Sequence, residues 1–129
     1  MSDAIVYADQ ARVREGKLDE LEEVMADLVE FVEENEPQIL SYDVYFSADG
    51  TRMTVIHVHP DSASLEFHMD IGREKFLPIG EFMEIQTIDV YGRPNEKVLE
   101  QLHDKASTLG SGAVSIHELH HGFERFAVG

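Results

Sequence analysis

The sequence has 129 residues, of which 43% are hydrophobic and 28% are charged, as expected for a single globular domain. It contains no cysteine, which excludes disulfides and zinc–thiolate sites, and its 26 acidic and 10 basic residues give a net charge of −16. Such an acidic surface repels nucleic-acid backbones and anionic membranes, so we expect neither as a partner. The acidity indicates either a solvated surface or a salt-adapted host.

The first ten residues, MSDAIVYADQ, contain no basic region followed by an apolar stretch, as a signal peptide would. No apolar run approaches the ~20 residues that cross a bilayer. We therefore expect a cytoplasmic protein.

The spacing of apolar residues predicts the secondary structure. In chain order, we expect a strand over 4–13, a helix over 17–35, strands over 39–47 and 51–59, a helix from Asp61 or Ser62 to about 71, short turns, a strand over 84–91, a helix over 95–109 and a β-leaning tail over 113–128.

The two central strands form a predicted hairpin around Asp49-Gly50, a pair that favours a tight turn. With those two residues as the loop, Tyr42 lies opposite His57. One face of the hairpin then carries Leu40, Tyr42, Val44, Phe46, Met53, Val55, His57 and His59.

The order β-α-β-β-α-β predicts a ferredoxin-like α+β fold, an antiparallel sheet with both helices on one face. We expect residues 1–91 to form this domain and residues 92–129 to pack on it as a C-terminal helix and tail. The second face of the sheet stays bare in a monomer, which predicts a symmetric homodimer through that face.

Residues 40–45, 54–61 and 63–68 resemble the second strand, third strand and following helix of the antibiotic biosynthesis monooxygenase family. The resemblance covers residues 4–91 and implies a dimeric α/β barrel that oxidises small phenolic or quinol-like molecules without a cofactor. This chain has His57 and His59 on the third strand, where many members carry Glu and Trp. No histidine lies between Met69 and Gln101, which argues against a haem-degrading relative.

Three histidines are the candidates for chemistry. His57 and His59 are two apart on a strand, so their side chains point the same way, about 6–7 Å apart. His68 lies on the helix expected to cover them, at the position where the family commonly has a histidine, and we expect it to act as a general base. The expected substrate-binding residues are Tyr42, Met53, Val55, His57, His59 and Met69.

Two other interpretations of these histidines remain open. They are hydrogen-bonded wall residues, or the pair on the strand and His68 form a three-nitrogen metal site. The sequence His117-Glu118-Leu119-His120-His121 also matches the H-E-x-x-H pattern of zinc proteases. That pattern needs a helix, and the tail is predicted to be β-like, so we interpret the match as coincidental.

The predicted function is therefore that of a cofactor-free monooxygenase or oxidase with a small-molecule substrate. The competing interpretation is a non-catalytic, dimeric ligand-binding or stress-associated barrel. Ring opening or isomerisation of lactones is also compatible with this scaffold, because a fold does not determine an activity.

Overall fold

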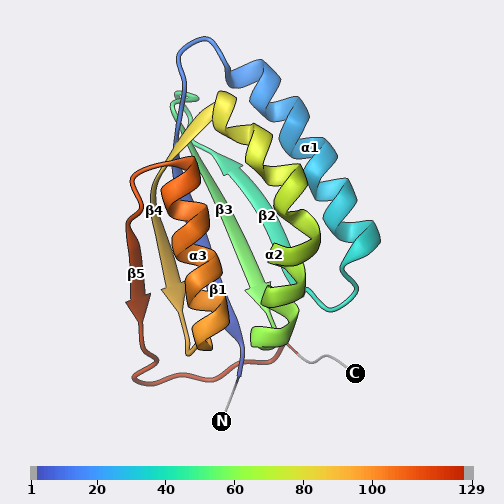
Figure 1. Ribbon diagram of the computed structural model, residues 1–129, viewed down its shortest axis with the longest axis vertical. Coiled ribbons are helices and arrows are strands. Elements are labelled where there is room, and N and C mark those ends of the chain that lie inside the picture. The colour runs from blue at the N-terminus through green and yellow to red at the C-terminus, as the bar shows by residue number, and fades with distance from the viewer. Residues whose placement is uncertain (1–2, 127–129) are drawn as a thin grey trace.

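The computed structural model describes residues 3–126, which form a five-stranded sheet with helices on one face (Figure 1). The strands lie in the order β2-β3-β1-β4-β5. The elements are β1 (Ile5–Val13), α1 (Leu18–Asn35), β2 (Ser41–Phe46), β3 (Arg52–His59), α2 (Ser62–Phe76), the short 3₁₀ helix η1 (Leu77–Glu81), β4 (Met83–Tyr91), α3 (Glu96–Leu109) and β5 (Val114–His117). The ferredoxin-like α+β fold is confirmed.

The hairpin has the predicted register, with Tyr42 opposite His57 and Phe46 opposite Met53. Its loop is longer than predicted, because the last backbone hydrogen bond joins Ser47 N–H to the Arg52 carbonyl. The Asp49 carboxylate accepts hydrogen bonds from the Thr51 backbone and hydroxyl, which holds the wider loop in place. The register is nevertheless the predicted one, because Ser47 lies opposite Arg52 and Phe46 opposite Met53 in both cases.

Helices α1, α2 and α3 all cover the same face of the sheet. Each presents an apolar stripe, and these stripes and the inward side chains of the strands form one core. Helix α2 continues through Gly72 to Phe76, although the sequence predicted its end near Ile71. Gly72 is buried at this point, and tertiary packing outweighs its low helix propensity.

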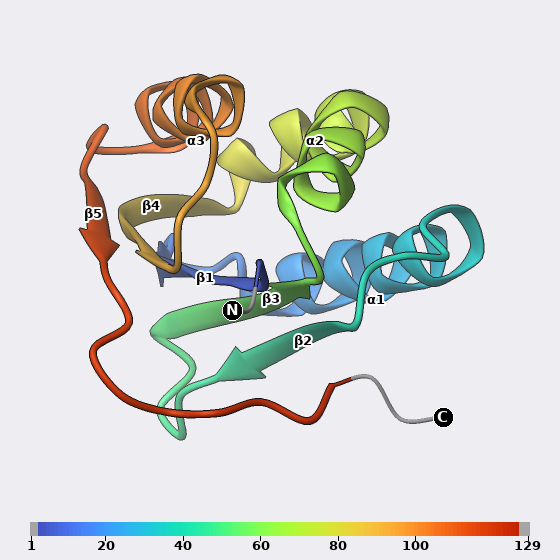
Figure 2. The same cartoon turned by 90° about the horizontal axis from the view of Figure 1, so that it is seen from below.

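The C-terminal region is less regular than predicted. Only Val114–His117 form a strand, which pairs in parallel with β4, and residues 118–126 contain no helix or strand. Figure 2 shows this tail on the side of the sheet away from α2 and α3. The H-E-x-x-H segment is not helical, as expected, and the predicted tail residues 127 and 128 lie outside the described residues.

The face of the sheet opposite the helices is partly apolar. Ala8 and Val58 lie near its centre, and Tyr45 and Tyr91 are about half exposed toward its margins. Exposed Phe123 belongs to the tail on the same side. No helix within residues 3–126 is both long and apolar enough to cross a membrane.

Two glycines provide a matched test of this packing. A Cβ on Gly110 would lie 1.9 Å from the Ile85 carbonyl oxygen, whereas a Cβ on Gly72 would make ordinary contact with the Phe76 ring at 3.6 Å. We expect Gly110→Ala to lower the free energy of unfolding by about 1–3 kcal/mol through overpacking. Gly72→Ala, in a helix, should raise it by about 0.5–1 kcal/mol. Urea unfolding measures both, and equal effects would contradict the described packing of α3 and β4.

Candidate functional site

A cluster of polar side chains is buried between the sheet and the helices. Alternation along β1 and β3 turns one row of each strand toward the helices, and each row contains polar residues among apolar ones. None of the cluster is more than 5% exposed, and its members are Tyr7, Asp9, Glu36, His57, His59, Ser64, His68 and Lys105. Buried polar groups are costly unless paired, so their partners determine what the cluster can do.

Asp9 is at the centre of the first set of contacts. Its Oδ2 accepts hydrogen bonds from His57 Nε2 and from Lys105 Nζ, both at 2.9 Å. Burial alone would raise the pKa of the Asp9 carboxyl, but the Lys105 ammonium and His57 together hold it well below its usual range. An ionised Asp9 can only accept, so His57 must carry its proton on Nε2. The Nδ1 atom of His57 is therefore a buried acceptor, and it has no partner among residues 3–126.

Burial also lowers the pKa of His57 to about 3, against the opposing effect of Asp9. The ring is stacked on Tyr7, with centroids 3.8 Å apart. Burial and the Asp9 charge raise the pKa of the Tyr7 hydroxyl above its ordinary value. His57 and Tyr7 are therefore both neutral at physiological pH.

Glu36 and His68 form the second pair. Glu36 follows the last residue of α1, and its Oε2 lies 2.6 Å from His68 Nδ1 on α2. Within the described residues, no lysine or arginine forms an ion pair with Glu36. Burial raises the pKa of Glu36 to about 7 and, together with the Lys105 charge, lowers that of His68 to about 3. Unlike Asp9, Glu36 therefore changes its ionisation near neutral pH.

His59 makes the third contact, in which its Nδ1 lies 2.8 Å from the Ser64 hydroxyl. Its Nε2 is buried and has no hydrogen-bond partner in the described part of the chain. Burial, with smaller effects of the other two histidines, lowers the pKa of His59 to about 2. All three imidazoles are thus neutral, and each uses one nitrogen in a hydrogen bond.

The predicted triad of histidines is brought together. The ring centroids are 5.1 Å apart for His57 and His68, 5.4 Å for His59 and His68, and 6.3 Å for His57 and His59. The planes of the two strand histidines differ by only 16°, so the two rings are nearly parallel. Across residues 3–126, no three histidine or carboxylate side chains are arranged to hold a metal ion.

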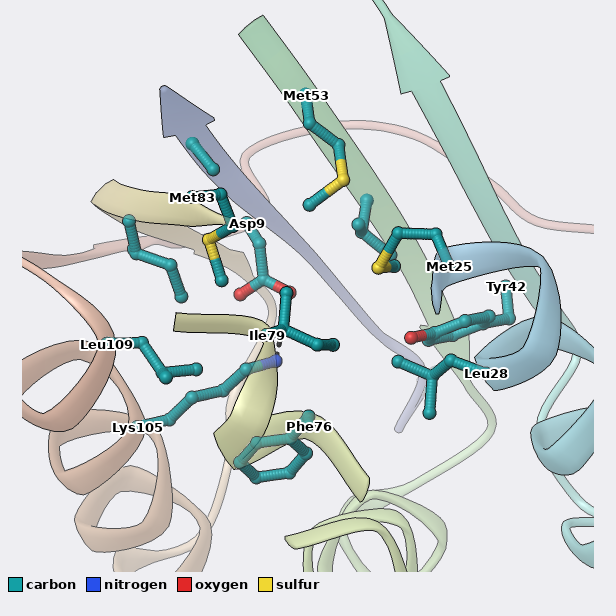
Figure 3. A pocket seen from close by; sticks show the side chains of 13 residues that line it. Asp9, Met25, Leu28, Tyr42, Met53, Phe76, Ile79, Met83, Lys105 and Leu109 are labelled. Atoms are coloured by element: carbon teal, nitrogen blue, oxygen red, sulfur yellow. Dashed lines mark hydrogen bonds and ion pairs between the residues drawn. The ribbon is translucent and has the colours of Figure 1, made fainter. Parts of the chain in front are cut away.

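A cavity of about 20 Å³, room for about one water molecule, lies beside this cluster. Figure 3 shows the Asp9 carboxylate, the Tyr42 hydroxyl and the Lys105 side chain around it. Of the predicted substrate-binding residues, Tyr42, Met53 and Val55 line this cavity. His57, His59 and Met69 do not, nor does the predicted base His68. The other lining side chains are Ala11, Met25, Leu28, Phe76, Ile79, Met83, Ile85 and Leu109.

Sequence reasoning missed the buried ion pair of Asp9 and Lys105. Asp9 continues the inward row of β1 between Tyr7 and Ala11, where an apolar residue is expected. Lys105 interrupts the apolar stripe of α3 in the same way. A charged residue at a core position was the available signal for both.

The chain is similar to proteins that are already known. The sequence model described as "Antibiotic biosynthesis monooxygenase" matches residues 5–71. No curated protein sequence matches the chain.

Several solved structures share the fold. MupZ from Pseudomonas fluorescens has 21% identity and a TM-score of 0.77, and the alignment covers 100% of this chain and 94% of that chain. SnoaB, a cofactor-independent oxygenase from Streptomyces nogalater, has 13% identity and a TM-score of 0.62, with 73% and 96% covered. A conserved protein from Methanosarcina mazei has 24% identity and a TM-score of 0.59, with 70% and 92% covered.

The Asp9–Lys105 pair predicts strong coupling in stability. Asp9→Asn or Lys105→Met alone leaves the other charge buried and unpaired, which costs about 3–5 kcal/mol. The double variant leaves no charge, so its cost should be clearly less than the sum of the two single costs. Urea unfolding of the four proteins measures the coupling, and strictly additive costs would rule out a buried ion pair.

Proposed function

This chain belongs to the antibiotic biosynthesis monooxygenase family, and we propose that it is a cofactor-independent monooxygenase or oxidase of a small phenolic or quinol-like substrate. The observation that carries the proposal is the Glu36–His68 pair, buried on both sides and separated by 2.6 Å. A carboxylate behind an imidazole fixes the ring and increases its capacity to take up a proton.

In the proposed reaction, His68 accepts a proton from a substrate hydroxyl on its Nε2. When Glu36 is ionised, it accepts the Nδ1–H of His68, which leaves the lone pair on Nε2. Loss of the proton leaves an electron-rich anion that can pass an electron to O₂. For an anthrone that reacts as its enol, one oxygen atom becomes the new carbonyl. The other leaves as water with two hydrogens, the proton held by His68 and the hydrogen left on the oxidised carbon.

The cavity supports a largely apolar substrate. Met25, Met53 and Met83 contribute to its wall, and methionine side chains are unbranched and adaptable. An aromatic ring needs far more room than about 20 Å³, and His68 does not line the cavity. We therefore propose that these side chains move when the substrate enters and that the space then extends past Tyr42, whose ring centroid is 5.6 Å from that of His68. A dry, closed site then protects the reactive anion from water.

Oxygen consumption with a panel of hydroquinones and anthrones tests the activity. We expect turnover that survives a metal chelator and falls by about 10²–10⁴-fold in His68→Gln, because a general base contributes on that scale. His103→Gln, which changes an exposed histidine, is the control and should keep full activity. Turnover abolished by the chelator would contradict the cofactor-independent mechanism.

The Glu36–His68 pair also predicts a pH dependence. Below about pH 7 Glu36 is protonated and donates to Nδ1, so the hydrogen of neutral His68 is on Nε2 and the base is blocked. Turnover should therefore rise with pH through about 7. In Glu36→Gln the amide oxygen accepts the Nδ1–H at every pH, so turnover should persist below this value. An unchanged profile in Glu36→Gln would show that Glu36 does not control the base.

The non-catalytic alternative is favoured by one observation, the small volume of the cavity. A ligand-binding barrel without activity would consume no oxygen with any member of the panel, and His68→Gln would not change that result. The buried acceptor on His57 and the unpartnered nitrogen of His59 support the enzyme, because a purely structural cluster has no use for them.

We also propose that the protein is a homodimer through the face of the sheet opposite the helices. Apolar and aromatic side chains that stay partly exposed on this face, Tyr45, Ile56 and Tyr91, support the proposal. Ile56→Glu should shift the protein from dimer to monomer in sedimentation velocity, because it places a charge in the apolar contact. His103→Glu adds the same charge on α3 and should leave the dimer intact. A monomeric wild-type protein would refute the proposal.

A further inference from the structure

Lys105 occupies an unusual position for a lysine. It lies on the inward stripe of α3 with Leu102, Ala106 and Leu109, and it is only 5% exposed. Its Nζ lies 2.9 Å from Asp9 Oδ2 and 3.5 Å from the Tyr7 hydroxyl. A lysine this deeply buried is rare unless it is paired, since removing its charge from water is costly.

The ammonium has bonding capacity left over. It has three N–H donors, and within residues 3–126 it has two hydrogen-bond partners, the second of them distant. Asp9 also has an unused acceptor, because its buried Oδ1 has no hydrogen-bond partner among the described residues. Both residues line the cavity, and their side chains meet at its edge in Figure 3. An unused hydrogen-bond donor and an unused acceptor therefore belong to two residues that line a mostly apolar space.

A purely structural role does not account for this arrangement. Two apolar side chains of similar volume would fill the space between α3 and β1 without any desolvation cost. The rings of Tyr7 and Phe76 lie 5.2 Å and 4.9 Å from Nζ, which supports a cation at this point but forms no hydrogen bond with it. The free N–H of an ammonium in an apolar cavity is suited to an oxygen that carries negative charge.

We propose that Lys105 is a substrate-binding residue whose ammonium receives the substrate oxygen on which negative charge collects after the hydroxyl loses its proton. The inference rests on the proposed function and narrows its substrate to molecules that form a delocalised oxyanion, such as phenols and enols. The proton passes to His68, its electron pair stays on the substrate, and Lys105 stabilises the resulting anion. Asp9 holds the ammonium in place and partly offsets its positive charge.

This role is assigned to a helix beyond the segment that identifies the family. The family match ends at residue 71, whereas Lys105 lies on α3. The alignment with MupZ covers the whole chain, whereas those with SnoaB and the Methanosarcina mazei protein cover 73% and 70% of it. We therefore expect Lys105 to distinguish the substrate of this chain from those of shorter relatives.

Binding of para-nitrophenol tests the proposal without any turnover, because its phenolate absorbs visible light and its phenol does not. We expect the wild-type protein to bind the phenolate in preference to the phenol. Lys105→Met should weaken phenolate binding by at least about tenfold, as the loss of a hydrogen bond to a charged group does. Asp9→Asn should have the opposite effect and strengthen it, because the carboxylate that offsets the ammonium is gone. Lys97→Met, on the exposed side of α3, should change nothing.

Two further variants distinguish a loss of phenolate binding from a loss of folding. Lys105→Arg keeps the charge and should retain most of the phenolate preference. The double variant Asp9→Asn/Lys105→Met leaves no buried charge, and it should bind the phenolate as weakly as Lys105→Met. The proposal is overturned if the wild-type protein does not bind the phenolate, if the double variant binds it as tightly as wild type, or if Asp9→Asn weakens binding as Lys105→Met does.

The outcomes separate this inference from the proposed function. Oxygen consumption that depends on His68, with phenolate binding independent of Lys105, would uphold the oxygenase and overturn the role of Lys105. Phenolate binding that depends on Lys105, without oxygen consumption by any member of the panel, would uphold the binding site and contradict the oxygenase.

Discussion

The buried charge of Asp9 is the constraint on which the rest of the site depends. A carboxylate 5% exposed on the central strand β1 requires compensation, and it receives it from two separate elements. Lys105 reaches it from α3, and His57 reaches it from the neighbouring strand β3. Because the sheet, the helix layer and α3 must all be in place for these contacts, the polar cluster and the fold depend on each other.

The two carboxylate–imidazole pairs of the cluster differ in one respect that separates their roles. Asp9 has a cation beside it, so it stays ionised and fixes the His57 tautomer. Glu36 has no such cation within the described residues, and burial moves its pKa to about 7. The first pair is therefore a fixed scaffold of charge, whereas the second can gain and lose a proton under physiological conditions. Two similar pairs acquire different ionisation behaviour from their surroundings.

Much of this arrangement follows from local patterns in the sequence. Period-2 alternation and antiparallel pairing were enough to place Tyr42 opposite His57 on the helix-facing side. The helical spacing of α2 placed His68 above them. The predictions of the hairpin-loop length and of the end of α2 were wrong, because side-chain hydrogen bonds and core packing determine these two features.

The partners of the histidines were beyond this kind of reasoning. Glu36 is one of 26 acidic residues, and only its contact with His68 in the folded structure distinguishes it from the others. The two residues are 32 positions apart in the sequence. Asp9 and Lys105 are 96 positions apart, and their contact depends on how α3 packs against the sheet. Asp9 and Lys105 each interrupt an apolar pattern, and such an interruption indicates a buried charge. The pattern does not show which residue pairs with that charge.

The difference between the two pairs can be observed directly by ¹⁵N NMR of the histidine rings across neutral pH. The account predicts that His57 stays neutral, with its proton on Nε2, throughout the range. It predicts that neutral His68 moves its proton from Nε2 to Nδ1 as the pH rises through about 7, when Glu36 ionises. If both rings instead become doubly protonated together just below neutral pH, as exposed histidines do, the buried pairs do not control the site and the account is contradicted.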